Sequence, residues 1–127
     1  MTGTRGDASS LADRPRRAYR DRDLDQLAPL LADDVLWGDV GHPRGCRNRA
    51  DVLATFSALM GEGVDGQITE LEEGTEGLLC GLEVRWPEDS HRRRDPPLFH
   101  VYLVRGGLIS EIRPYDDRAS AAEAAGL

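Results

Sequence analysis

The chain has 127 residues, which is enough for one domain with its own hydrophobic core but too few for two. Its composition, 39% hydrophobic and 31% charged, is typical of a globular protein in water, and no apolar run is long enough to cross a bilayer. The formal net charge of -7 disfavours binding to nucleic acid, and the use of arginine for every basic residue excludes a catalytic lysine and is typical of a GC-rich bacterial genome.

The N-terminal part of the chain predicts two short helices. Residues 1–12 lack the apolar centre of a signal peptide, so we expect a disordered lead to a single cytoplasmic domain of residues 13–127. Apolar residues at helical spacing predict a helix over about residues 14–22, with Asp13 as its cap. Asp23 caps a second helix with a leucine stripe, which Pro29 shortens or kinks.

The next segment predicts a strand, a loop and a longer helix. Residues 35–39 read as a strand whose one face mixes apolar side chains with the Asp39 carboxylate. After the loop, Asn48 with Asp51 three residues later has the pattern of a capping box. The helix that it opens is apolar on one side and ends near Gly61.

The second half of the chain predicts strands and a final helix. Residues 66–73 form a weak strand and residues 77–86 a clearer one, with apolar and polar side chains in alternation at its end. Residues 98–115 predict a β-hairpin, because a Gly-Gly pair separates two runs of β-branched and aromatic residues. Asp117 caps an alanine-rich helix that Gly126 closes.

The first strand of the hairpin is apolar on both faces, with His100 as the polar exception on the face that it shares with Leu98 and Tyr102. A strand buried on two sides belongs in the middle of a sheet that is covered on each face. Helices followed by an antiparallel meander therefore predict an α+β domain, in which a strongly curved sheet wraps the helices.

Several of these stretches together resemble a known family. RDLDQLAPLLADDVLWGD, followed by Gly45 and the Asn48 helix, then HVYLVRGGLISEIRPYDD and the terminal AAEAAGL, resemble the SnoaL-like proteins. These belong to the same superfamily as ketosteroid isomerase and nuclear transport factor 2. The resemblance covers the chain from about residue 14 onward. It implies a cone-shaped, largely antiparallel mixed sheet around N-terminal helices, a deep apolar pocket, and a homodimer through the outer sheet face.

The resemblance also suggests two catalytic residues. In register, Asp39 falls on the proton-abstracting base of ketosteroid isomerase, and burial in an apolar pocket would raise the pKa of that carboxyl. If the hairpin is one residue shorter, His100 falls on the acid that holds the developing oxyanion. Two alternatives stay open: Asp39 caps the loop that follows it, and His100 is a core histidine with a protein partner.

Other side chains are expected to line the pocket and contact a small apolar molecule. They are Tyr19, Trp37, Phe56, Glu83, Arg85, Leu98, Tyr102, Ile112 and Asp116. Glu83 and Arg85 share one strand face, so they either pair inside the pocket or form a solvated outer face.

Departures from the family pattern leave two hypotheses for function. The isomerase's tyrosine falls on Pro15, and the Asp-Arg-Asp set of the related epoxide hydrolases falls on Arg85, Glu83 and Pro114. The chain is then either a cofactor-free isomerase, cyclase or dehydratase acting on an apolar cyclic metabolite, or a non-catalytic pocket or dimerisation module. The three histidines lack metal-ligand spacing, so we expect neither a metal nor another cofactor.

Overall fold

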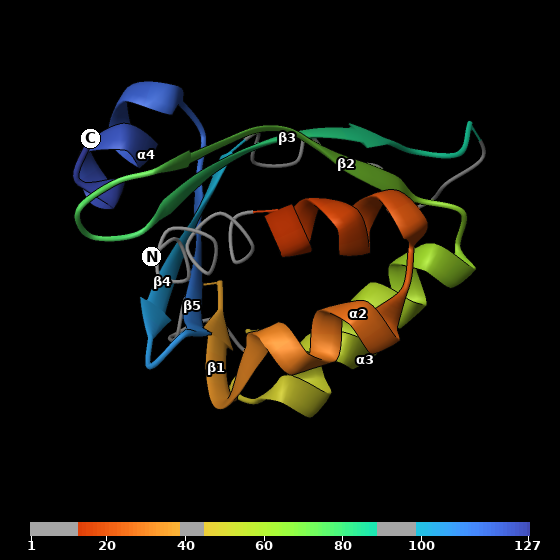
Figure 1. The fold of residues 1–127 in the computed structure, drawn as a ribbon. Helices are drawn as coiled ribbons and strands as arrows, with labels where there is room; N and C mark the ends of the chain where they lie inside the picture. The colour runs from red at the N-terminus through yellow and green to blue at the C-terminus, as the bar shows by residue number, and fades with distance from the viewer. Residues whose placement is uncertain (1–12, 39–44, 89–98) are drawn as a thin grey trace.

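A curved five-stranded sheet is the frame of the molecule in the computed structural model, which describes residues 13–38, 45–88 and 99–127 (Figure 1). The strands are β1 (Leu31–Trp37), β2 (Asp65–Glu73), β3 (Leu78–Arg85), β4 (Phe99–Arg105) and β5 (Leu108–Tyr115). Their order in the sheet is β1-β5-β4-β3-β2, with β1 parallel to β5 and all other pairs antiparallel. The predicted α+β class with a curved mixed sheet is confirmed.

The predicted hairpin forms β4 and β5. Gly106 and Gly107 join the strands with φ of +60° and +81°, the left-handed conformation that a two-residue hairpin turn needs and that glycine adopts without strain. Both faces of β4 are buried, as the apolar pattern predicts. Tyr102 lies in the inner core, and Val101 packs with Leu79 and the C-terminal helix on the outer side.

The N-terminal helices lie on the inner side of the sheet. Residues 13–21 are helical, so Asp13 is part of the helix and is not its cap. Asp23 caps α2 (Leu24–Leu27) by accepting a hydrogen bond of 2.9 Å from the Asp25 N–H. Pro29 lies in the short 3-10 helix η1 (Ala28–Leu30) that follows, which explains why α2 is only one turn long.

The first strand begins four residues earlier than predicted. Leu31 belongs to β1 and pairs with Ile109 of β5, although its spacing from earlier leucines fits a helix. Pairing with β5 and complete burial decide the conformation of Leu31 here. Asp33 and Asp34 are therefore strand residues, and their exposed side chains form ion pairs with Arg49 and Arg105 respectively.

Two further helices cover the sheet, and each has the cap that the sequence predicts. In α3 (Arg49–Gly61) the Asn48 side chain accepts a hydrogen bond of 2.8 Å from the Asp51 N–H. In α4 (Arg118–Ala125) the Asp117 carboxylate accepts from the Ser120 N–H, and α4 ends at Gly126 in the left-handed conformation. No helix in the described ranges is long and apolar enough to span a membrane.

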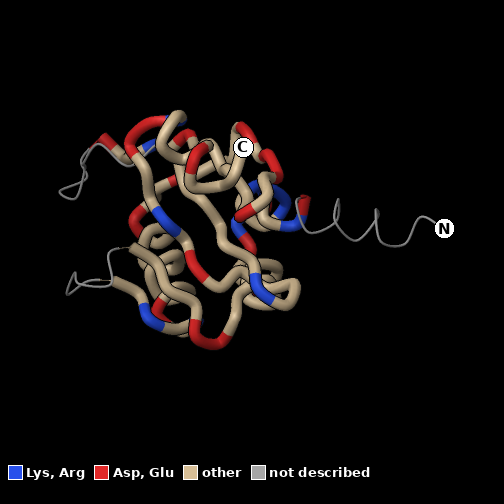
Figure 2. The backbone as a smooth tube through the Cα atoms, turned by 90° about the vertical axis from the view of Figure 1, so that its left-hand side faces the viewer, with Lys and Arg blue, Asp and Glu red and all other residues tan. Residues whose placement is uncertain are grey.

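Acidic and basic residues are interspersed along the described backbone (Figure 2). On the outer sheet face, Glu83 pairs with Arg85 and Glu111 pairs with Arg113. Acidic and basic positions are therefore mixed on this face.

Candidate functional site

A cavity of about 170 Å³ lies between the inner face of the sheet and the helices. The sheet curves around the helices here, and the β2–β3 pairing shifts register between Ile68 and Glu70, an irregularity of the kind that increases strand curvature. The wall is largely apolar, and its members are Ala18, Tyr19, Leu27, Trp37, Phe56, Leu59, Met60, Val64, Gly66, Leu82, Val84, Trp86 and His100. The remaining lining residues, Arg22, Asp23 and Asp65, form a polar rim.

Aromatic rings from four elements meet in the wall. The Phe56 ring of α3 stacks on the Trp37 ring of β1 with centroids 5.0 Å apart, and the Tyr19 ring meets Phe56 edge-on at 5.4 Å. The His100 ring lies edge-on to Trp37 at 6.0 Å. These are the arrangements that aromatic quadrupoles favour. The fold thus brings together four of the predicted site residues.

His100 is a buried histidine on the inner face of the sheet. It lies on β4 opposite Cys80 and is 7% exposed. Among the described residues, none hydrogen-bonds to its Nδ1. Burial disfavours the charged ring and lowers the pKa of His100 to about 4. At neutral pH the imidazole is uncharged and offers one donor and one acceptor.

A chain of hydroxyl and thiol groups lies behind the aromatic wall. The Cys80 thiol donates to the Tyr102 hydroxyl at 3.6 Å, and Tyr102 donates to the Tyr19 hydroxyl at 2.9 Å. Burial raises the pKa of both tyrosines and raises that of Cys80 to about 12, so all three groups are neutral. They can give or take hydrogen bonds, but they cannot serve as anionic nucleophiles at neutral pH.

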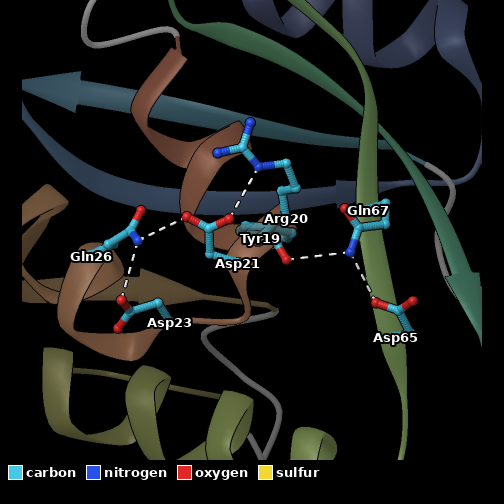
Figure 3. A network of polar contacts seen from close by, with 7 residues as sticks. All are labelled: Tyr19, Arg20, Asp21, Asp23, Gln26, Asp65 and Gln67. Carbon is cyan, nitrogen blue, oxygen red and sulfur yellow. Dashed lines mark hydrogen bonds and ion pairs between the residues drawn. The ribbon is translucent and has the colours of Figure 1, made fainter.

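A polar network fixes the rim of the cavity (Figure 3). The Gln67 amide donates to the Asp65 carboxylate at 2.9 Å and to the Tyr19 carbonyl at 3.3 Å, which ties β2 to the N-terminal helix. Arg22 has a φ of +51°, which is unusual for a residue other than glycine, and its guanidinium donates to the Met60 carbonyl at 3.3 Å. The same guanidinium lies 3.7 Å from the Asp65 carboxylate. The entrance is therefore held by three elements rather than by a free loop.

Known structures with the same architecture identify the fold. No family model and no curated protein sequence matches the chain. A protein of unknown function from Burkholderia pseudomallei, described as NTF2-like, aligns over 95% of this chain and 98% of its own, with 18% identity and a TM-score of 0.66. The chain has the nuclear transport factor 2-like fold. This confirms the fold implied by the resemblance to SnoaL-like proteins.

Two other structures with the nuclear transport factor 2-like fold come from Mycobacterium tuberculosis. One, solved in complex with estradiol-17beta-hemisuccinate, is 19% identical, has a TM-score of 0.64 and aligns over 89% of this chain and 95% of its own. The other, an epoxide hydrolase, is 18% identical, has a TM-score of 0.61 and aligns over 94% of this chain and 85% of its own. Further members with this fold are assigned as polyketide cyclases and as a ketosteroid isomerase. At these identities the similarity establishes the fold alone.

Two predicted pocket residues lie on the wrong side of the sheet. The side chains of Glu83 and Arg85 are 58% and 77% exposed on the outer face, where they lie 3.4 Å apart. Successive side chains of a strand point to opposite faces, and Leu82 and Val84 occupy the inner one. The expectation that Glu83 and Arg85 contact a ligand in the cavity is therefore wrong, and the alternative of a solvated face is what the structure has.

The other predicted residues lie at various distances from the cavity wall. Tyr102 and Ile112 are buried in the inner core and are not among the residues that line the cavity. Asp116 is exposed after the end of β5. Asp39 and Leu98 lie outside the described residues. In the described ranges, no group of three or more His, Cys, Asp or Glu side chains could hold a metal ion.

Sequence reasoning missed several wall and rim residues. Trp86 could have been found, because it continues the inner-face alternation of Leu82 and Val84. Arg22 and Asp65 carry no such signal. They meet because the chain turns sharply after the N-terminal helix and because β2 begins directly beside that turn, and neither fact is visible in a local pattern.

Proposed function

We propose that this chain binds a small apolar molecule in the cavity. The observation that carries the proposal is an apolar, aromatic-rich wall that includes His100, whose buried Nδ1 has no hydrogen-bond partner among the described residues. Buried polar atoms are almost always paired in proteins, so a buried nitrogen without a partner among the described residues is an unusual member of such a wall. Cavities of about 150 Å³ lined by apolar side chains bind benzene, so a ring-sized body fits here.

Apolar contact alone would give weak binding. A ring that loses about 150 Å² of accessible surface gains about 4 kcal/mol, which corresponds to a dissociation constant near 1 mM. A hydrogen bond between the ligand and His100 would add specificity and affinity. Without the ligand this buried nitrogen stays unpaired, so the new bond does not replace a bond to water. The aromatic surfaces of Phe56 and Trp37 would hold a planar body by stacking.

Titration with naphthalene, followed by tryptophan fluorescence, tests this proposal. Val84→Phe places a ring in the cavity wall and should abolish the fluorescence change. Arg85→Phe places the same ring on the neighbouring residue but on the outer face, so its titration should match the wild type. Equal binding by the wild type and Val84→Phe would mean that the probe binds elsewhere and would refute the proposal.

Acid-base catalysis on a cyclic metabolite is a second candidate function. In this version Asp39 is the base and His100 the donor, as the family resemblance implies. The observation that favours it is the contact between the Trp37 and His100 rings at 6.0 Å, since Asp39 follows Trp37 by only two residues in the chain. Isomerisation, cyclisation and dehydration all need such a pair of proton-transfer groups in one cavity.

An NMR titration of the His100 ring tests whether Asp39 reaches the cavity. A neighbouring carboxylate favours the imidazolium, so Asp39→Asn should lower the pKa of His100 further. Asp33→Asn removes the same charge from an exposed position of β1 and serves as the control. If Asp39→Asn and Asp33→Asn leave the His100 titration equally unchanged, the two groups do not share a cavity and the catalytic version fails.

We also propose that the chain forms a homodimer through the outer sheet face, as the family resemblance implies. The exposed Glu83–Arg85 and Glu111–Arg113 pairs on that face favour a polar interface in which salt bridges are exchanged between copies. Sedimentation should then give twice the chain mass of 14.0 kDa, and this mass should fall in high salt. A mass of 14.0 kDa at all protein concentrations would refute the dimer.

A further inference from the structure

The first helix (residues 13–21, red in Figure 1) has an exposed face that is rich in arginine. Its other face is buried and consists of Pro15, Ala18 and Tyr19. The side chains that remain in solvent are all charged: Asp13, Arg14, Arg16, Arg17, Arg20 and Asp21. Positive charges therefore outnumber negative ones on this face, although the formal net charge of the chain is -7.

Three of these arginines differ from most other arginines of the described chain in their contacts. Elsewhere an arginine typically lies within ion-pair distance of a carboxylate, as do Arg22, Arg49, Arg85, Arg105, Arg113 and Arg118. In the part of the chain that the structure describes, Arg14, Arg16 and Arg17 form no such pair. We call these three side chains the basic patch.

The two acids on the same helix do not neutralise the basic patch. Asp21 accepts hydrogen bonds from the Gln26 amide at 3.0 Å and from Arg20 at 3.1 Å (Figure 3). Arg17 attracts Asp21 only from beyond ion-pair distance. Asp13 forms no ion pair within the described ranges and could balance only one arginine. The patch therefore has an excess of positive charge.

The arrangement of these arginines works against the stability of the helix. Like charges three or four residues apart on a helix repel, and this applies to Arg14 with Arg17 and to Arg16 with Arg20. Features that a fold does not need for its own stability are typical of functional sites. The repulsion therefore indicates an anionic partner outside the chain.

The chemistry of the exposed face distinguishes between the classes of anionic partner. It has no apolar side chain that could enter a lipid bilayer. It has no aromatic ring on which a nucleic-acid base could stack, because Tyr19 is buried. The net charge of -7 also disfavours a phosphate backbone. Carboxylates need only the guanidinium groups, with which they form paired hydrogen bonds.

From these observations we infer that the basic patch is a docking surface for an acidic segment of another protein. The carboxylates of that segment pair with Arg14, Arg16 and Arg17. Ala18 and Tyr19, which line the cavity, lie on the buried face of the same helix, so a docked partner and a ligand in the cavity do not compete. This inference does not depend on the proposed function of the cavity.

Fluorescence anisotropy of a labelled peptide of eight glutamates tests the inference. The wild type should bind this peptide in low salt, and binding should weaken as salt screens the charges. The helix variant Arg14→Gln/Arg16→Gln/Arg17→Gln loses three ion pairs with the peptide and should bind it about tenfold more weakly. The control variant Arg49→Gln/Arg105→Gln/Arg118→Gln changes the net charge by the same amount, but at arginines that are paired within the chain, so its affinity should stay close to that of the wild type.

Urea unfolding separates docking from a role in the fold. The helix variant should be as stable as the wild type or slightly more stable, because the repulsion between neighbouring arginines is removed. A marked loss of stability in the helix variant would show that these arginines stabilise the fold, and would overturn the inference.

The binding experiments have other outcomes that would overturn it. No binding of the glutamate peptide by the wild type, or equal weakening in both variants, would mean that the patch is not a specific docking surface. Tighter binding of a thymidine octanucleotide or of phosphatidylserine vesicles would assign the patch to nucleic acid or to a membrane. Self-association that is lost in the helix variant alone would assign it to a second copy of the chain.

Discussion

Replacing His100 by leucine should make the protein markedly less sensitive to acid. Burial lowers the pKa of His100 from 6.5 to about 4 in the folded chain. The unfolded chain therefore takes up the proton first as the pH falls. Stability that is present above the unfolded pKa is lost progressively down to the folded one, that is, between about pH 6.5 and about pH 4.

The expected magnitude follows from the two pKa values. A factor of ten in proton affinity is worth 1.36 kcal/mol, so the wild type should lose about 3 kcal/mol across this range because of His100 alone. His100→Leu should not show this loss of stability, because leucine does not take up a proton. At neutral pH leucine also removes the unpartnered Nδ1, so the variant should be as stable as the wild type or up to about 2 kcal/mol more stable.

This difference can be measured by urea unfolding, followed by tryptophan fluorescence, of the wild type, His100→Leu and His100→Gln. Glutamine is polar but does not titrate, so it separates the loss of protonation from the gain in apolar contact. Both variants should gain about 3 kcal/mol relative to the wild type between about pH 7 and about pH 4. If the three free-energy curves stay parallel over this range, His100 is not a buried neutral histidine and its assignment to the cavity wall is wrong.

Three further substitutions test other parts of the site by urea unfolding and naphthalene titration. Phe56→Ala should lower the free energy of unfolding by about 2 kcal/mol and weaken naphthalene binding, because it removes the stack on Trp37. Unchanged binding would show that the Phe56 ring is not part of the ligand site. Tyr102→Phe should lower the free energy of unfolding by about 1 kcal/mol, because it removes the hydrogen bond to Tyr19, and should have little effect on binding, because Tyr102 does not line the cavity. An unchanged free energy of unfolding would argue against the buried hydroxyl chain. Arg85→Ala should change stability by less than about 0.5 kcal/mol and leave binding intact, and weakened binding would contradict its outer position.

Local sequence patterns predicted those parts of the fold that local physics decides. The Gly106-Gly107 turn and the caps at Asn48 and Asp117 depend on a few neighbouring residues, and all were predicted correctly. The start of β1 was predicted four residues too late. Leu31 has helical spacing, and only its pairing with a strand almost eighty residues away makes it part of the sheet.

For the candidate site too, some residues were predicted correctly from the sequence and others were not. Tyr19, Trp37, Phe56 and His100 were predicted and do meet in one wall. The side chains of Glu83 and Arg85 were assigned to either face, since alternation along a strand gives two faces without saying which one is inside. The family resemblance could not decide which face is inside, because residue roles in this fold depend on individual positions. The position of the isomerase's tyrosine, for example, is occupied by the buried Pro15.

A crystal structure of the protein soaked with naphthalene tests most directly whether this cavity is the ligand site. We expect the naphthalene ring against Phe56 and Trp37. An empty cavity beside a probe bound on the outer sheet face would show that the hollow is a packing defect and not a binding site.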